Sequence, residues 1–184
     1  LPTADITFIT TPDDTIPSLC TQLSNEATLK PESIIAHMSG ILDSDVLMPV
    51  KKQNVSIGSL HPLKAFRKTH KPEHHAFKNV DCAIEGEARA VTCLTTLAQT
   101  LGAHVFDLAP EKKATYHAAA IMASNYLVTL AAASSTLFKE AGIADDDALK
   151  LCTRLMQTSL DNLKHVQTPE QALTGPLMRS DINT

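Results

Sequence analysis

Residues 109–142 read APEKKATYHAAAIMASNYLVTLAAASSTLFKEAG, and this stretch organises the rest of the chain. Pro110 suits a first helical position, where its missing N–H costs nothing, and Gly142 can supply a left-handed stop. The residues between them include no Gly or Pro, so they predict one helix of roughly 45 Å at 1.5 Å per residue. Its middle is apolar on almost every side, which predicts a helix that is buried all round.

Four polar residues interrupt this helix. Lys113, His117 and Ser124 fall within a narrow stripe at about 100° per residue, and Asn125 lies on its flank. A cation, an imidazole, a hydroxyl and an amide on one line of a buried helix need partners or a chemical function. We therefore take these four as candidate catalytic residues. The structural alternative is that Lys113 and Tyr116, in the first turns, reach solvent and that Ser and Asn bond to the helix's own carbonyls.

Composition narrows the classes of function. The chain has 184 residues and a net charge of −4 with no basic stripe, so one domain, or one and part of another, is expected and nucleic acid is not. No run of eighteen or more uninterrupted apolar residues exists, and no membrane partner is expected. The four cysteines, without a CxxC pair, are typical of reduced thiols in a cytoplasmic protein: Cys20, Cys82, Cys93 and Cys152.

The first half of the chain alternates short β-branched strands with helices. Strands are predicted at residues 4–10, 33–37, 55–59, 82–84 and 104–108, and helices at 16–23, 44–53, 87–101, 110–142 and 145–165. This order is typical of βαβ units and a parallel sheet. We expect an α/β domain over residues 1–109 and a helical domain over residues 110–184.

Polar residues follow three of the predicted strands. They are TPDD at residues 11–14, HMSG at 37–40 and GSLHP at 58–62. Ligands of parallel α/β sheets bind beyond the carboxyl ends of the strands, so these loops predict a site, although turn residues also occur there for structural reasons. The six glycines form neither GxGxxG nor a P-loop. His70, His74 and His75 lack carboxylate or thiol companions, so no metal site is expected.

Several motifs, in order, resemble one family over essentially the whole chain. They are HMSG (37–40), GSLHPLKAF (58–66), AIEGE (83–87), LGAHVFDL (101–108), KATYHAAAIMASNYL (113–127) and ALTGPLMRSD (172–181). The chain is similar to the Rossmann-type NADP-dependent reductases of the deazaflavin-dependent NADP oxidoreductase-like type, whose C-terminal half is catalogued as a domain of unknown function. Wider relatives include ketopantoate reductase, pyrroline-5-carboxylate reductase and the β-hydroxyacid dehydrogenases.

The resemblance implies a Rossmann-like dinucleotide-binding domain followed by an all-helical domain that forms a homodimer. Lys113 matches a Lys on the interdomain helix that meets the substrate, whereas His117 stands where relatives often have Asn. Family members begin with a strand, GxGxxG and a helix, and they continue beyond the RSD-like motif. Leu1 matches a point inside the Rossmann domain, so the chain is expected to be a fragment that lacks both ends.

The resemblance further implies NADP(H)-dependent reduction of a small carbonyl compound, with ketopantoate or another 2-oxo acid as the first candidate. The residues expected to border the cofactor are Thr11, Pro12, Asp13, His37, Ser39 and Gly40. Those expected to meet the substrate are Ser59, His61 and Arg179. A rigid turn at His61-Pro62 that only shapes the pocket wall is the structural alternative. The competing function is a non-catalytic dimerising scaffold, or a truncated fragment without its cofactor-binding half.

Overall fold

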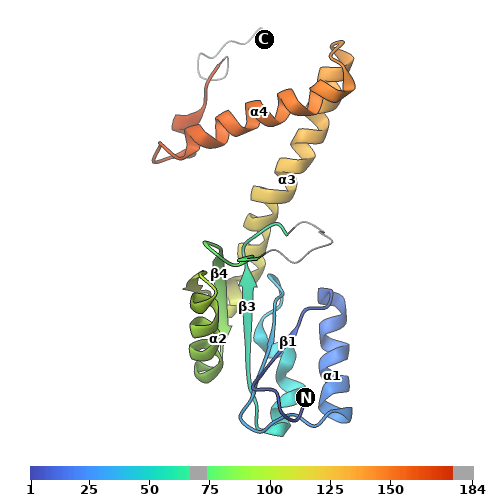
Figure 1. The fold of residues 1–184 in the computed structure, drawn as a ribbon, viewed down its shortest axis with the longest axis vertical. Coiled ribbons are helices and arrows are strands. Elements are labelled where there is room, and N and C mark those ends of the chain that lie inside the picture. Colours follow the sequence, from blue (N-terminus) through green and yellow to red (C-terminus); the bar gives the residue numbers. More distant parts are fainter. Residues whose placement is uncertain (67–73, 176–184) are drawn as a thin grey trace. The chain divides into compact units, whose positions relative to one another are not determined.

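The computed structural model describes residues 1–66 and 74–175 and forms two compact units, Leu1–Met122 and Ala123–Thr184. We call them the sheet unit and the helical unit (Figure 1). In the sheet unit the strands are β1 (Ile6–Ile9), β2 (Ile34–His37), β3 (Ser56–Pro62), β4 (Asp81–Gly86) and β5 (His104–Asp107). The helices there are η1 (Asp13–Thr15), α1 (Ile16–Glu26), η2 (Ser44–Gln53), α2 (Ala88–Thr100) and η3 (Pro110–Lys112), followed by the first turns of α3 (Lys113–Glu140). The α/β fold class predicted from the sequence is confirmed.

The five strands form one sheet in the order β1-β2-β3-β4-β5. β1, β2 and β3 are parallel, and so are β4 and β5, but β4 runs antiparallel to β3. The expectation of a wholly parallel sheet was therefore wrong at this pair. A parallel return needs a crossover connection, usually a helix, and the described part of the link between β3 and β4 contains none. The carboxyl ends of β1, β2 and β3 still meet at one edge.

Apolar side chains cover both faces of the sheet, because successive residues of a buried strand point to opposite faces. Ile34 and Ala36 of β2 pack with one core cluster, which includes Leu94 of α2. Ile35, between them, packs with the other cluster, which includes Ile16 of α1. The sheet is thus buried between α1 with η2 on one face and α2 on the other.

The helical unit contains the rest of α3, α4 (Asp145–Leu163) and η4 (Pro169–Ala172). Gly142 ends the long helix as predicted: its φ is +87°, its N–H donates to Lys139, and Ile143 N–H donates to Phe138. α4 then packs against α3, and the thiol of Cys152 lies 3.7 Å from the carbonyl oxygen of Ala131.

The prediction that the long helix is buried all round was wrong for this chain. Lys113 is the one residue of α3 that is buried, whereas Val128 and Leu137 are 69% and 65% exposed. A single neighbouring helix covers only one stripe of such a rod. By length and composition alone the segment Pro110–Glu140 could cross a membrane, but its first turns belong to the sheet unit, where Lys113 is buried.

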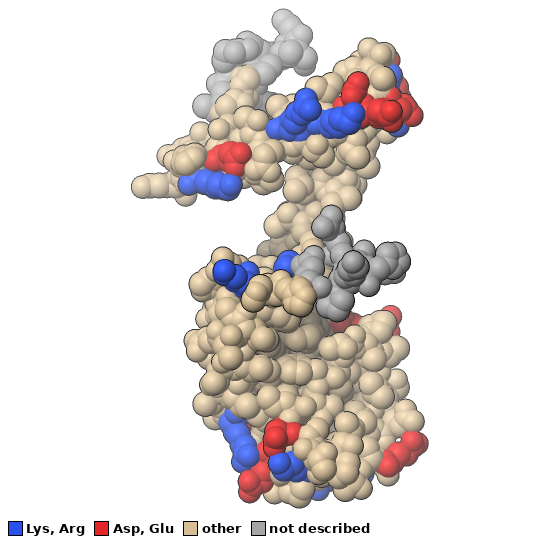
Figure 2. All heavy atoms as spheres, viewed as in Figure 1, with Lys and Arg blue, Asp and Glu red and all other residues tan. Residues whose placement is uncertain are grey.

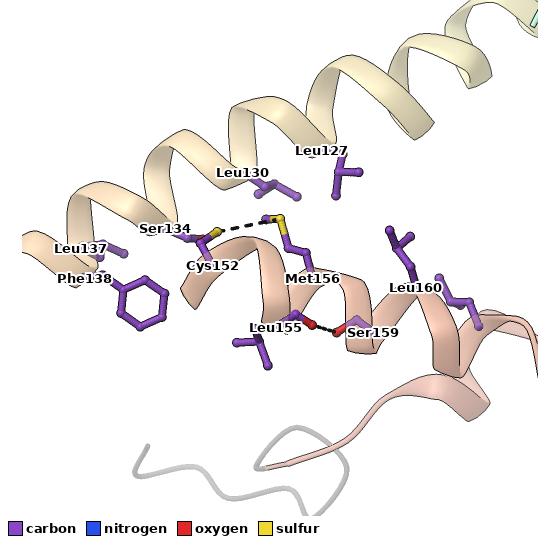
Figure 3. Close-up of a pocket in the computed structure, with 11 residues that line it drawn as sticks. Leu127, Leu130, Ser134, Leu137, Phe138, Cys152, Leu155, Met156, Ser159 and Leu160 are labelled. Atoms are coloured by element: carbon purple, nitrogen blue, oxygen red, sulfur yellow. Dashed lines mark hydrogen bonds between the residues drawn. The ribbon is translucent and has the colours of Figure 1, made fainter. Parts of the chain in front are cut away.

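α3 and α4 leave an apolar groove of about 700 Å³ between them. Leu127 and Leu130 of α3 and Met156 and Leu160 of α4 point into this space (Figure 3). The charged residues lie elsewhere. On the face shown in Figure 2, Lys and Arg lie among Asp and Glu, so neither sign dominates that face.

Candidate active site

A pocket of about 310 Å³ opens at the edge of the sheet where β1, β2 and β3 end. Its lining residues are Ile9, Thr10, Thr11, Asp13, Met38, Ser39, His61, Pro62, Lys64 and Phe66. Four residues predicted to border cofactor or substrate are among them: Thr11, Asp13, Ser39 and His61. The three loops that the sequence analysis placed at one edge therefore line a single pocket.

The loop after β2 is held by its own side chains. His37 is fully buried: its Nε2 lies 2.9 Å from the carbonyl oxygen of Asp43, and its Nδ1 accepts from the N–H of Ser39 at 3.2 Å. Ser39 Oγ accepts from the N–H groups of Ile41 and Leu42. Burial lowers the pKa of His37, so the ring is neutral here. His37 thus shapes the loop, and both its ring nitrogens are occupied.

Lys113 is buried at the start of α3, with 2% of its side chain exposed. Its ammonium group donates to the carbonyl oxygen of Ser39 at 3.1 Å and to Ser59 Oγ at 2.5 Å. Glu85 Oε1 lies 3.5 Å away, which is an ion-pair distance and too long for a good hydrogen bond. Ser44 Oγ donates to the other carboxylate oxygen at 2.7 Å. Lys113 therefore joins α3 to β3, β4 and the loop after β2.

Burial lowers the pKa of Lys113, and the carboxylate of Glu85 acts in the opposite direction. Removing one partner of a buried ion pair leaves an uncompensated charge, which costs about 3–5 kcal/mol. The Ser59 side chain is likewise fully buried, and its hydroxyl oxygen accepts a hydrogen bond from Lys113. Neither Lys113 nor Ser59 lines the pocket of about 310 Å³.

Gly40 lies where two imidazoles come close to the main chain. A Cβ added at Gly40 would stand 2.6 Å from His117 Nδ1 and 2.8 Å from His61 Nε2, so no larger residue fits without a shift. The two rings have centroids 6.1 Å apart. His117 Nδ1 is buried and has no hydrogen-bond partner among the described residues. A buried nitrogen in that state calls for an explanation, such as a ligand or a water, although His117 itself does not line the pocket of about 310 Å³.

Tyr116 supports His61 from α3. Its hydroxyl oxygen lies 2.8 Å from His61 Nδ1, and the two rings pack edge to face with centroids 5.5 Å apart. Desolvation lowers the pKa of His61 to about 4, with a further contribution from the positive charge of Lys113. Burial raises the pKa of Tyr116 to about 12. Both side chains are thus neutral near pH 7.

The other predicted residues lie as follows. Pro12 is exposed in the loop between β1 and η1. Ser124 and Asn125 belong to the helical unit, where Ser124 Oγ donates to the Asn125 side-chain oxygen at 2.9 Å. Arg179 lies outside the described residues, as does His70. Within residues 1–66 and 74–175, no three His, Cys, Asp or Glu side chains are placed to hold a metal ion.

Sequence reasoning missed two site residues. One is Glu85, the buried partner of Lys113, and a carboxylate within the apolar strand CAIEG was its signal. The other is Tyr116, for which the sequence offered only the structural alternative of reaching solvent. The pairing of β3 with β4 sets Ser59 opposite Glu85 and so explains why Lys113 reaches both side chains.

The fold and the strand-end pocket define a Rossmann-type α/β protein. Residues 80–184 match the family model described as "Domain of unknown function (DUF2520)", and the chain belongs to this family. No curated protein sequence matches the chain.

Solved structures share the fold over almost the whole chain. Protein TM1727 from Thermotoga maritima is 28% identical with a TM-score of 0.76, covering 97% of this chain and 66% of its own. BF3122 from Bacteroides fragilis, whose own assignment as an NADP oxidoreductase is provisional, is 22% identical with a TM-score of 0.77. The match covers 100% of this chain and 66% of BF3122. The 1-pyrroline-5-carboxylate reductase of Streptococcus pyogenes is 16% identical with a TM-score of 0.63. The match covers 98% of this chain and 63% of the reductase. The chain thus spans just under two thirds of the length of each.

Proposed function

We propose that this protein is a cytoplasmic NADP-dependent oxidoreductase that reduces a small carbonyl compound, with 2-oxo acids such as ketopantoate as the first candidates. The observation that carries the proposal is the pocket at the carboxyl ends of β1, β2 and β3, which the imidazole of His61 lines, with the ring of His117 6.1 Å from that of His61. In α/β sheets this edge is where ligands bind. The likeness to structures named as NADP oxidoreductases supports the choice of chemistry.

The pocket suits the nicotinamide end of a dinucleotide. Ile9, Met38 and Phe66 provide apolar walls for a planar ring, and Thr11 and Ser39 add polar atoms to the lining. Thr11, Pro12, Asp13, Ser39 and Gly40 would border the cofactor, with His37 holding their loop in shape. When bound, NADPH supplies a hydride to the carbonyl carbon.

Negative charge grows on the substrate oxygen during reduction, and prearranged donors that meet this charge lower the barrier. His61, with Arg179 as a further candidate, would contact the substrate. His117 would donate the proton that the oxygen takes up, since an imidazole is a common proton donor and the ring of His117 lies 6.1 Å from that of His61, which lines the pocket. Lys113 would act through the Ser39 carbonyl that it binds, as a fixed positive charge close to the pocket.

We also infer that a second copy of the chain covers the groove between α3 and α4. Leu130 and Leu155, which line the groove, are 60% and 62% exposed. Exposed apolar surface of this extent marks an interaction site, and most oligomers are built from copies of one chain. A dimerising scaffold without activity is the second candidate function, because the groove alone would serve it.

Filling the pocket separates the two functions. Thr11→Trp places a large ring at the pocket, whereas Thr100→Trp adds the same ring at an exposed position at the end of α2. NADPH oxidation is followed with a panel of 2-oxo acids, ketopantoate first. We expect turnover by the wild type and by Thr100→Trp, and a loss of at least ~10-fold in Thr11→Trp. A scaffold predicts no NADPH oxidation by any of the three proteins.

A further inference from the structure

The contact between Tyr116 and His61 bears on which of the two ring nitrogens of His61 carries the proton. We propose that Tyr116 is a positioning residue that fixes His61 as the tautomer protonated on Nε2, so that His61 offers the pocket a neutral N–H donor. The geometry is the 2.8 Å contact between the Tyr116 hydroxyl and His61 Nδ1. The Tyr116 ring is itself held edge-on by Phe106, with centroids 6.1 Å apart.

The direction of this hydrogen bond depends on the protonation of both groups and on which of them is the stronger donor. Burial raises the pKa of Tyr116 to about 12, so the phenol keeps its proton near pH 7. Burial lowers the pKa of His61 to about 4, so the imidazole carries one proton. A phenol oxygen can also accept, so the neutrality of both groups alone allows either direction. A phenol O–H is a stronger donor than a neutral imidazole N–H, and an imidazole nitrogen is a better acceptor than a phenol oxygen, so we infer that the phenol donates to Nδ1 and that Nδ1 carries no proton. The proton is therefore on Nε2.

Nε2 is the ring nitrogen of His61 that Tyr116 does not contact. It faces Gly40, at 2.8 Å from where a Cβ would stand, and His61 lines the pocket together with Ser39 and Thr11. The charged or titratable groups that act on His61 are Lys113 and His117 on α3 and Asp13 on η1. The positive charge of Lys113 disfavours a second proton on the ring.

A neutral imidazole N–H suits one class of acceptor. It can stabilise negative charge that develops on a carbonyl oxygen, as neutral imidazole electrophiles do, without attracting carboxylates in the ground state. Resting on the proposed function, this assigns His61 to the reacting carbonyl oxygen. The carboxylate of a 2-oxo acid would then be bound by a different, cationic group.

The test uses the spectrum of the ring in the absence of any substrate. The ¹⁵N chemical shifts of His61 distinguish Nδ1–H from Nε2–H in the wild type, in Tyr116→Phe and in Tyr126→Phe. Tyr126, the other tyrosine of the chain, is 56% exposed and serves as the matched control. We expect Nε2–H in the wild type and in Tyr126→Phe, and a mixture of the two tautomers in Tyr116→Phe. Thermal melts confirm that each variant is folded.

An activity measurement then tests the link to the reaction. Tyr116→Phe is expected to lower kcat by about 10-fold with little change in KM, because the ring still binds but is less often the correct donor. An Nδ1–H shift pattern in the wild type, or an unchanged tautomer in Tyr116→Phe, overturns the proposal. If the tautomer responds as expected but no carbonyl compound is reduced, the positioning role of Tyr116 stands and the proposed function fails.

Discussion

The ammonium group of Lys113 lies 3.5 Å from Oε1 of Glu85, and only 2% and 4% of these side chains are exposed. One charge comes from the first residue of α3 and the other from β4. The pair fixes the start of the long helix against the middle of the sheet. The buried lysine is thus part of the fold and also places a positive charge beside the loop that lines the pocket.

Lys113→Met should lower the free energy of unfolding by about 3–5 kcal/mol, because it leaves the Glu85 carboxylate buried without its cation. Urea denaturation measures this loss. Lys112→Met, at the exposed neighbouring position, should change stability by less than about 0.5 kcal/mol. Lys113→Met with Glu85→Gln should be more stable than Lys113→Met alone, and equal stability of the two would refute the role of the pair.

Gly40→Ala should destabilise the protein by about 1–3 kcal/mol, the usual cost of overpacking. The new methyl would stand 2.6 Å from His117 Nδ1 and 2.8 Å from His61 Nε2. Adding His117→Ala removes one of these clashes. Thermal melts should therefore show that Gly40→Ala costs less in the His117→Ala background than in the wild type, and purely additive losses would contradict this packing.

Stability should depend on pH through His61, whose pKa falls from 6.5 to about 4 on folding. Between these values the unfolded chain binds a proton that the folded chain does not, so stability rises with pH in this window and is lost as pH falls through it. At pH 5 the loss from this group is roughly 1–2 kcal/mol. His61→Gln should reduce the difference in unfolding free energy between pH 7 and pH 5. The exposed His104→Gln should keep that difference, and a His61→Gln protein with the full pH dependence would count against the assignment.

The inferred dimer should depend on the apolar groove of the helical unit. Leu155→Glu places a charge in the groove lining, and Thr153→Glu places the same charge at an exposed position on α4 outside that lining. Light scattering should report dimers for the wild type and for Thr153→Glu, and monomers for Leu155→Glu at low micromolar concentration. A monomeric wild type at high micromolar concentration would rule the dimer out.

Local sequence patterns predicted the elements of the fold well. The short apolar run of β2, Pro110 before α3 and Gly142 after it each reflect a rule that acts over a few residues. The antiparallel β4 was not predictable in the same way, because the direction of a strand depends on the path of its connection. The exposure of α3 depends on what covers it, which the sequence of one chain does not specify.

Only the part of the candidate site that depends on strand order could be predicted from the sequence. Thr11 and Ser39 follow β1 and β2, and His61 lies at the end of β3, so sequence order and topology sufficed to bring them to one pocket. Glu85 and Tyr116 enter through contacts between residues far apart in the chain. Such contacts follow from strand register and from the docking of a helix, neither of which a motif encodes.

Transfer of the hydride itself tests the central claim most directly. NADPH carrying deuterium at both C4 positions of the nicotinamide is incubated with the protein and the 2-oxo acid panel, and each product is analysed by mass spectrometry. The proposed function predicts a hydroxy acid that carries the deuterium on the former carbonyl carbon, formed by the wild type and by Thr100→Trp but strongly reduced in Thr11→Trp. Unlabelled product throughout the panel, or equal labelling in Thr11→Trp, would contradict hydride transfer at this pocket.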